Sequence, residues 1–456
     1  MFLETVRSPG LAHLSYILGD AGVVAVIDPR RDFEAYLAIA AREGCRITHV
    51  FETHRNEDYV VGSTGLADAG AEVYHGAQTP FGYGNAVSEG EEFQLGSLLL
   101  RVVHTPGHTG ESISLVLHDT AFSREAPVAV FTGDALFVGD AGRTDFFPGR
   151  EEEMAGLLHD SIFGKLLPLG DGVILYPGHG QGSICGGNPA AREFSTLGYE
   201  REHNPALGVR SKEEFVARKT AERLFMPAYF ERVHALNQEG PPPLATLPSP
   251  LPLDPAAFEE ISSGCGILDV RSKEAYAGAH LPGSLAVSLD KVSAYAGWYL
   301  DPARPVCLVV NSAGEVEEAV RRLVRLGFDD IPAFLAGGVL KWEVSGRPYG
   351  RMAAVHAAEL VAMLEAEEDF LLLDVRSAEE YAGGHLPTAV NIHMGELPRR
   401  LEEIPKDRRV VTFCGSGERA TVAASVLRMH GYEKVDACFG SMAACNALGC
   451  PLEMDG

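Results

Sequence analysis

The sequence lacks an excess of positive charge, a long hydrophobic run and a basic leader. Its 456 residues include 38 Lys and Arg against 63 Asp and Glu, a formal net charge of −25. Because nucleic-acid binding depends on basic side chains that displace counterions, this balance predicts no nucleic-acid partner. No window approaches the roughly 18 apolar residues of a membrane span, and no basic segment precedes an apolar one at the N-terminus. We therefore expect a cytoplasmic protein without membrane contact.

The sequence also lacks any Cys-x-x-Cys pair, which argues against a structural zinc knot. Its eight cysteines are expected in a reducing compartment, where thiols are catalytic, metal-binding or buried rather than disulfide-bonded. The hydrophobic share of 46% and the charged share of 22% are typical of a folded globular protein. A small molecule is thus the favoured partner, and a homo-oligomer is compatible with this composition.

A proline-rich segment, residues 241–255, divides the chain. Seven prolines in GPPPLATLPSPLPLDP predict an extended linker without regular structure. After it, LDVRSKEAYAGAHLPGS (268–284) recurs as LDVRSAEEYAGGHLPTA (373–389). The repeat predicts two copies of one domain, residues 256–350 and 351–456.

Each copy alternates short apolar runs with helix-like segments, which is typical of an α/β domain with a parallel sheet. The first block, residues 1–240, is instead dominated by strand-like runs, with helices expected at about 32–43, 151–166 and 211–236. We expect mixed sheets covered by helices in this block, so the whole chain is of the α/β class.

Four strand-like runs of the first block end in a side chain that binds metals. THVFETH ends at His54, RVVHTPGH at His108, VAVFTGD at Asp134 and VILYPGH at His179. A single histidine is more often a surface or core residue, but the joint pattern is harder to explain by chance. Because loops at strand ends often hold functional groups, we expect these side chains to converge at the rim of a sheet.

The motifs TPGHTGES, FTGDALF and YPGHG resemble the metallo-β-lactamase superfamily, and FVGDAGRTDF resembles its glyoxalase II and persulfide dioxygenase branch. The resemblance covers about half of the chain and implies an αββα sandwich. Dinuclear zinc hydrolases of this superfamily carry Thr-His-x-His-x-Asp-His, whereas this sequence reads THRNEDY, with Asn56 and Tyr59 in two histidine positions. An amide is a poor zinc ligand, and a phenol binds only after losing its proton.

His54, His108 and Asp134 are retained, giving two imidazoles and one carboxylate. This set is preferred by mononuclear non-haem Fe(II), which keeps open positions for O2 and substrate. By resemblance, these three positions match the iron ligands of persulfide dioxygenases, which oxidise a thiol persulfide to thiol and sulfite. We predict one Fe(II) per chain, with zinc as the alternative metal.

Four further residues are assigned to this region. Asp58 and His179 are expected to orient the ligands through hydrogen bonds, with a weak second metal as the alternative. Arg143, in the GRTDF loop, would hold a substrate carboxylate or form a structural ion pair. Cys185, in QGSICGGN, would carry a persulfide to the iron or pack as a small buried side chain.

The repeated units, with DVR, a Tyr and then AHLP or GHLP, resemble rhodanese (sulfurtransferase) domains. In the second copy, Cys414 opens the Gly-containing loop of VVTFCGSGER, where backbone N–H groups and a helix N-terminus favour thiolate. Cys414 and Arg419 are one residue closer than in the Cys-x5-Arg loop of cysteine phosphatases, which favours sulfur transfer over phosphatase activity. The first copy has Asn311 and Val316 at these positions, so we expect it to be inactive.

The combined prediction is a persulfide dioxygenase fused to a sulfurtransferase, acting on O2 and a low-molecular-weight thiol persulfide. Sulfane sulfur on Cys414 would give thiosulfate if the two reactions are coupled. One alternative is a zinc thioester hydrolase of the glyoxalase II kind. Another is a sulfur-carrier scaffold with an inactive front domain. Gln181 stands where members that use glutathione persulfide often carry Tyr, so the thiol is left open.

Overall fold

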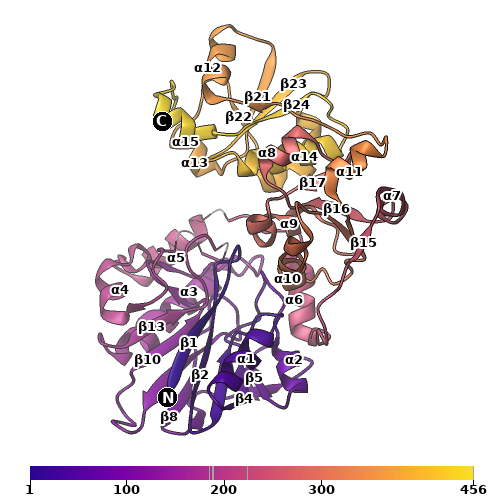
Figure 1. Ribbon diagram of the computed structural model, residues 1–456. Coiled ribbons are helices and arrows are strands. Elements are labelled where there is room, and N and C mark those ends of the chain that lie inside the picture. The colour runs from indigo at the N-terminus through magenta and orange to yellow at the C-terminus, as the bar shows by residue number, and fades with distance from the viewer. Residues whose placement is uncertain (184, 187–188, 223, 455–456) are drawn as a thin grey trace. The chain divides into compact units, whose positions relative to one another are not determined.

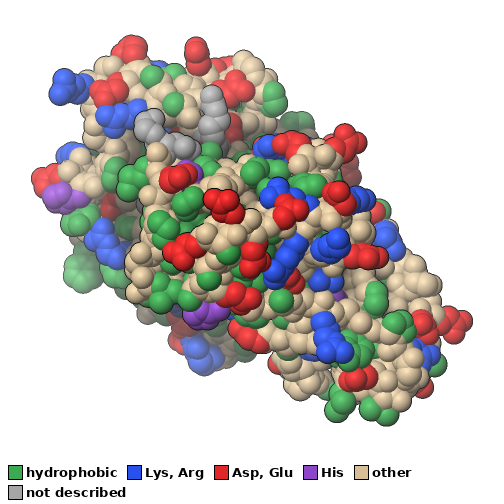
Figure 2. Space-filling view, turned by 90° about the horizontal axis from the view of Figure 1, so that it is seen from above, with side chains coloured by type: hydrophobic (Ala, Val, Ile, Leu, Met, Phe, Trp, Pro, Cys, Tyr) green, Lys and Arg blue, Asp and Glu red, His purple; other side chains and the backbone are tan. Residues whose placement is uncertain are grey.

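The computed structural model describes residues 1–183, 185–186, 189–222 and 224–454. These residues form two compact units, the first of residues 1–225, 229–247 and 324–327 and the second of residues 226–228, 248–323 and 328–456. The main division lies within the proline-rich segment, between residues 247 and 248. Figure 1 shows the first unit in indigo to magenta and the second in orange to yellow. Within the described ranges, no helix has both the length and the apolar character of a membrane span. On the face in Figure 2, acidic side chains are interspersed with basic and apolar ones.

The first unit contains two six-stranded sheets, ordered β1-β2-β3-β4-β5-β6 and β14-β13-β10-β9-β8-β7. The first sheet comprises β1 (Phe2–Ser8), β2 (His13–Asp20), β3 (Val23–Ile27), β4 (Arg46–Phe51), β5 (Glu72–Gly76) and β6 (Asn85–Val87). The second comprises β7 (Glu92–Leu95), β8 (Leu98–His104), β9 (Ile113–Asp119), β10 (Ala129–Gly133), β13 (Ile174–Pro177) and β14 (Ser195–Thr196). The remaining elements are α1 (Glu34–Arg42), α2 (Ser63–Asp68), β11 (Leu136–Phe137), β12 (Asp140–Ala141), α3 (Glu151–Ser161), α4 (Leu197–His203), α5 (Lys212–Ala221) and α6 (Phe230–Glu239).

The two sheets pack face to face, and helices cover their outer faces. In β3, Ile27 lies in the core between the sheets, whereas Val24 lies in the outer core under α1. In β10, Phe131 lies between the sheets and Val130 packs in the outer core with α3. Strands buried on both faces explain why these sequences are continuously apolar rather than alternating. The arrangement confirms the predicted αββα sandwich.

The expected single helix over 211–236 is wrong, because the structure has two helices, α5 and α6, separated by residues 222–229. Pro227 lies in this break, and a proline disrupts the interior of a helix because it lacks the backbone N–H. The break frees the carbonyls of Leu224 and Phe225, which accept hydrogen bonds from the Arg143 guanidinium.

The second unit contains two five-stranded sheets of equivalent order, β15-β19-β18-β16-β17 and β20-β24-β23-β21-β22, in which all the strand pairs are parallel. The first sheet comprises β15 (Leu251–Leu253), β16 (Gly266–Asp269), β17 (Ser284–Ala286), β18 (Val306–Val309) and β19 (Ala333–Leu335), with helices α7 (Pro255–Ser262), α8 (Lys273–Gly278), α9 (Val292–Tyr299), α10 (Val316–Arg325) and α11 (Gly338–Val344). The second comprises β20 (Ala354–Val355), β21 (Phe370–Asp374), β22 (Val390–Asn391), β23 (Arg409–Phe413) and β24 (Val435–Cys438), with α12 (Ala357–Glu365), α13 (Ala378–Ala382), α14 (Glu418–Met429) and α15 (Ser441–Leu448). The predicted α/β class with parallel sheets is confirmed.

The proline-rich segment is not entirely irregular, in contrast to our expectation for residues 241–255. Leu251–Leu253 forms β15 and pairs in parallel with β19. Strand β15 lies at the edge of its sheet, where Pro252 can stand without removing a required hydrogen bond. Regular structure of the second unit therefore begins inside this segment.

The sequence motif shared by the two copies has a structural role. In the second copy, Arg376 and Asp374 form a buried ion pair of 2.6 Å. The Tyr381 ring stacks on His385 with centroids 3.9 Å apart. The first copy repeats both contacts, at 2.6 Å for Arg271–Asp269 and 4.0 Å for Tyr276–His280. The motif is thus preserved in both copies irrespective of which one has a nucleophile.

We predict that Arg376→Ala lowers the free energy of unfolding by about 3–5 kcal/mol, because it leaves the Asp374 carboxylate buried without its partner. Urea unfolding followed by circular dichroism measures the change. The matched control is Arg400→Ala, which removes an exposed pair with Glu403 and should have a much smaller effect. Equal changes for the two variants would contradict a structural role for the motif.

Candidate metal centre and sulfur-transfer site

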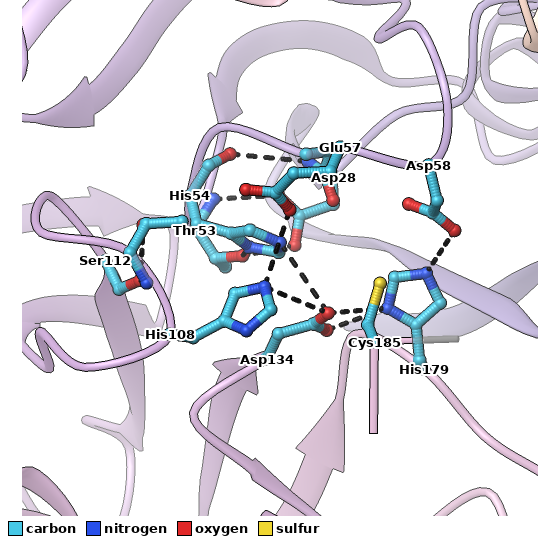
Figure 3. A network of polar contacts seen from close by, with 12 residues as sticks. Asp28, Thr53, His54, Glu57, Asp58, His108, Ser112, Asp134, His179 and Cys185 are labelled. Atoms are coloured by element: carbon cyan, nitrogen blue, oxygen red, sulfur yellow. Dashed lines mark hydrogen bonds and ion pairs between the residues drawn. The ribbon is translucent and has the colours of Figure 1, made fainter. Parts of the chain in front are cut away.

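The four predicted strand-end residues gather at one end of the sandwich (Figure 3). His54 follows β4 of the first sheet, whereas His108, Asp134 and His179 follow β8, β10 and β13 of the second. The expectation of a single sheet rim is therefore wrong, because the residues come from both sheets. The site forms only when the two sheets pack together.

His54, His108 and Asp134 lie close enough to share one ion. The Nε2 atoms of His54 and His108 are 3.7 Å and 3.6 Å from Asp134 Oδ2. Both Nε2 atoms are buried and have no hydrogen-bond partner. A metal bound at about 2.1 Å can bridge ligand atoms up to about 4.2 Å apart. The donor set thus fits a metal ion.

Hydrogen bonds at Nδ1 fix the orientation of both imidazoles. Thr53 Oγ1 donates to Asp28 Oδ2 at 2.7 Å and is left to accept from His54 Nδ1 at 2.9 Å. His108 Nδ1 donates to the Arg143 carbonyl at 3.0 Å. In each neutral ring the hydrogen is therefore on Nδ1, and Nε2 presents its lone pair.

A close backbone approach lets Asp134 reach the site. Gly133 has a φ of +50°, and a Cβ there would lie 2.3 Å from Thr53 Oγ1. A side chain at this position would displace the hydroxyl that orients His54. The glycine of FTGD therefore brings the first and second sheets together immediately before the aspartate.

His179 lies between two carboxylates. Its Nδ1 is 2.8 Å from Asp134 Oδ1, and its Nε2 is 3.0 Å from Asp58 Oδ2. Burial opposes protonation, but Asp134 and Asp58 raise the pKa of His179 well above its usual value. Both nitrogens of His179 thus face carboxylates, and the ring orients Asp134.

Asn56 and Tyr59, which replace two histidines of the dinuclear motif, contact other protein groups. The Tyr59 hydroxyl faces the Asp28 carbonyl, and its ring packs on His13 with centroids 4.0 Å apart. Burial and Asp28 raise the pKa of Tyr59 well above its usual value, so the phenol keeps its proton. Asn56 donates from Nδ2 to the His54 carbonyl. Neither residue offers an anionic or imidazole ligand.

Glu57 is a residue of this site that the sequence did not reveal. It is fully buried, and its Oε1 accepts from His234 Nε2 of α6 at 3.2 Å. Its Oε2 lies 3.5 Å from His108 Nε2 and has no hydrogen-bond partner. Burial opposes ionisation, but His108 and His234 hold the pKa of Glu57 below its usual value. Ligand atoms of His54, Glu57 and His108 all lie within 4.8 Å of one another.

The second predicted site lies at the end of β23. Cys414 is buried, and its Sγ accepts a hydrogen bond from the backbone N–H of Gly417 at 3.1 Å. Ser441 Oγ accepts from the Cys414 N–H at 3.1 Å and fixes the loop. Arg419, in the first turn of α14, forms a bidentate pair with Glu380 at 2.7 Å. Sulfur, loop N–H and helix N-terminus therefore meet as predicted for a nucleophile, with Arg419 beside them.

Comparisons with known proteins match both parts of the chain. The family model for the rhodanese-like domain matches residues 254–345 and 356–447. A sulfurtransferase of Allochromatium vinosum is 38% identical over 98 residues, which cover 22% of this chain and 92% of that protein. The structure of a metallo-beta-lactamase from Staphylococcus aureus subsp. aureus COL is 31% identical with a TM-score of 0.67, covering 74% of this chain and 99% of that one.

The chain belongs to the metallo-β-lactamase family, fused to two rhodanese-like domains. The bovine persulfide dioxygenase ETHE1, a mitochondrial protein of Bos taurus, is 29% identical over 236 residues, which cover 50% of this chain and 83% of that protein. The predicted resemblance to the persulfide dioxygenase branch is therefore confirmed. The metallo-β-lactamase match to 74% of the chain extends beyond the first unit, so the fusion itself has a structural precedent.

The sequence leaves two roles open for Arg143, binding of a substrate carboxylate or a structural ion pair. Its contacts favour the ion pair. Its guanidinium is fully buried and binds both carboxylate oxygens of Asp145 at 2.6 and 2.7 Å. Its carbonyl orients His108. Arg143 thus supports the metal-facing ring from behind, and its guanidinium is already held by protein groups.

Cys185 is buried beside the centre, within 4.8 Å of ligand atoms of Asp58 and His179. Burial, followed by the nearby Asp58 and Asp134, raises the pKa of this thiol well above its usual value. The side chain is therefore a neutral thiol at neutral pH. Residues 184, 187 and 188 of the same Gly-rich segment lie outside the described residues.

The first rhodanese-like copy contacts the Cys414 loop of the second copy. Lys273 Nζ donates to the carbonyls of Ser416 and Phe439 at 2.9 and 3.3 Å, and it lies 3.7 Å from Glu418. These groups surround the loop that begins at Cys414. The first copy therefore docks against this loop through Lys273.

Comparison of the two repeat sequences with each other could have identified Lys273 and Glu380. Lys273 of the first copy aligns with Ala378 of the second, so only the first copy has a lysine at this position. Glu380 aligns with Ala275, and Arg419 aligns with Val316. Both members of the Arg419–Glu380 pair are thus absent from the copy that lacks the nucleophile.

We predict that Lys273→Ala slows sulfur transfer by Cys414 about tenfold, because a lost charge-assisted hydrogen bond costs about 1.5–3 kcal/mol and loosens the loop. Transfer of sulfane sulfur from thiosulfate to cyanide measures the rate. Lys291→Ala, which removes an exposed lysine of the same copy paired with Asp290, is the control. Equal rates for the two variants would exclude support by the first copy.

Proposed function

We propose that this chain is a cytoplasmic Fe(II)-dependent persulfide dioxygenase and sulfurtransferase. The observation that carries the proposal is the convergence of His54, His108 and Asp134 at a single position, without the further histidines of a dinuclear zinc site. Two imidazoles and a carboxylate are preferred by non-haem Fe(II) with open positions. The similarity to the bovine persulfide dioxygenase supports the same reaction class.

The proposed reaction converts R–S–SH, O2 and water into R–SH and sulfurous acid. The two sulfur atoms together give up the four electrons that dioxygen takes up. Bound Fe(II) supplies the one-electron and O2 chemistry of this step. The substrate is a low-molecular-weight thiol persulfide.

The protein side chains hold and insulate this centre. The Nδ1 hydrogen bonds fix the lone pairs of His54 and His108, and His179 fixes the carboxylate of Asp134. His54 is 2% exposed and His108 is fully buried, so bulk water is kept from the reacting atoms. Exclusion of water also protects reactive intermediates from side reactions.

Cys414 supplies the second proposed activity. Its thiolate attacks the outer sulfur of the R–S–SH persulfide, and the R–S⁻ thiolate leaves with the electron pair of the broken S–S bond. Sulfite then attacks the outer sulfur of the Cys414 persulfide. The new S–S bond gives thiosulfate, and the thiolate of Cys414 leaves with the electron pair of the broken S–S bond. Arg419, beside the loop, is suited to attract the anionic sulfur species.

A zinc thioester hydrolase is the second candidate, and one observation favours it. Ligand atoms of Asp58, His179 and Cys185 lie within 4.8 Å of one another and would form a second metal site. Against this, both nitrogens of His179 face carboxylates. A sulfur-carrier scaffold without dioxygenase activity is distinguished by oxygen consumption.

We predict that the anaerobically Fe(II)-loaded protein consumes O2 with at least one of the persulfides of glutathione, cysteine, coenzyme A and bacillithiol. His108→Ala should lower both bound iron and O2 uptake by about 100-fold or more, because it removes a ligand rather than a supporting contact. An oxygen electrode and metal analysis provide the readouts, and His203→Ala at an exposed histidine is the control. Two zinc ions per chain with thioester turnover and no O2 uptake would establish the hydrolase instead.

We predict that Cys414→Ser leaves O2 uptake unchanged but converts the product from thiosulfate to sulfite, because serine cannot carry sulfane sulfur. Ion chromatography of the two sulfur anions measures the change. The parent and Cys450→Ser, which changes a cysteine outside the loop, should both form thiosulfate. Equal sulfite yields from the Cys414→Ser variant and the parent would show that the two activities are not coupled.

A further inference from the structure

We propose that Glu57 is a fourth protein ligand, which makes the centre a 2-His-2-carboxylate site. This inference deepens the proposed function and rests on its single metal centre. The carboxylate lies on the loop after β4, between the positions of the expected histidine motif. One of its ligand atoms lies within 4.8 Å of ligand atoms of His54 and His108, and all three residues are labelled in Figure 3.

The hydrogen-bond pattern requires a cation between these groups. Because His108 Nδ1 must donate to the Arg143 carbonyl, the neutral ring presents a lone pair at Nε2. Glu57 Oε2, 3.5 Å away, also presents only lone pairs and has no hydrogen-bond partner. Two buried acceptors that face each other are unfavourable unless a proton or a metal ion lies between them. His54 Nε2 adds a third lone pair and has no partner, so a metal satisfies more groups than one proton.

His234 leaves one oxygen of Glu57 available. It donates from Nε2 to Oε1 at 3.2 Å, so this oxygen is already bound. Oε2 is free to coordinate in a monodentate manner, and the contact with α6 fixes the side-chain orientation. His234 is therefore a positioning residue for Glu57.

The fourth ligand has two consequences for the centre. Glu57 and Asp134 together balance the charge of a divalent ion, which favours its retention in a buried site. A fourth protein ligand would also leave fewer open positions at a bound ion than the three-residue set, which would disfavour a substrate that chelates through two atoms.

The test compares Glu57→Gln and Glu57→Asp with the parent. Fe(II) affinity is measured by anaerobic titration, and the visible d–d spectrum of the Co(II)-loaded protein reports the coordination number. We expect both variants to bind Fe(II) about 100-fold more weakly and both Co(II) spectra to change. Aspartate keeps the charge but withdraws the carboxylate by one methylene, so parent-like behaviour of Glu57→Asp would overturn direct ligation.

Two controls separate ligation from indirect effects. Glu200→Gln changes another buried carboxylate of the same unit, which accepts from the Gly139 N–H, and should leave affinity and spectrum unchanged. His234→Ala should weaken Fe(II) binding by about 10-fold while keeping the parent Co(II) spectrum, as expected for a residue that only orients a ligand. A Co(II) spectrum unchanged in Glu57→Gln, with normal circular dichroism, would also overturn the proposal.

The test of Glu57 as a ligand can succeed or fail independently of the proposed dioxygenase activity. If the parent consumes no O2 but the Co(II) spectrum changes in both Glu57 variants, the proposed function fails and the ligand stands. If the parent consumes O2 and the spectra do not change, the function stands and Glu57 is not a ligand.

Discussion

The metal centre depends on where two imidazole rings carry their hydrogens. Thr53 and the Arg143 carbonyl take the Nδ1 hydrogens of His54 and His108, and the lone pairs of both Nε2 atoms then point at Asp134 Oδ2. A buried set of acceptors without donors is stable only around a cation. The sandwich holds these groups rigidly because they come from strand ends of two sheets that pack against each other.

The same network engages the residues around the position of the second metal in the superfamily's dinuclear hydrolases. In this chain, Tyr59 packs on His13 and keeps its proton, while His179 bridges Asp134 and Asp58. The groups around the second metal position therefore satisfy one another through hydrogen bonds. The hydrogen bonds of His179 also orient Asp134 at the first position.

Residue types at strand ends could be read from the sequence, because an apolar run followed by Gly or Pro and a ligand is a local pattern. The pairing of two sheets could not be read, since His54 and Asp134 are far apart along the chain. Glu57 gave no signal, because its position in the motif is variable and its direction is set by the loop and by His234 of α6. Pro227 could have located the break between α5 and α6. The hydrogen bonds that the Arg143 guanidinium donates to the carbonyls in this break could not be predicted, because Arg143 is distant in the sequence.

The two rhodanese-like copies separate what maintains the fold from what performs chemistry. The DVR ion pair and the Tyr–His stack occur in both copies. The repeated motif therefore maintains the fold and does not indicate which copy has a nucleophile. Cys414, Arg419 and Glu380 occur in only one copy, and Lys273 occurs only in the other. The hydrogen bonds that Lys273 gives to the Cys414 loop provide the first copy with a structural role that needs no nucleophile.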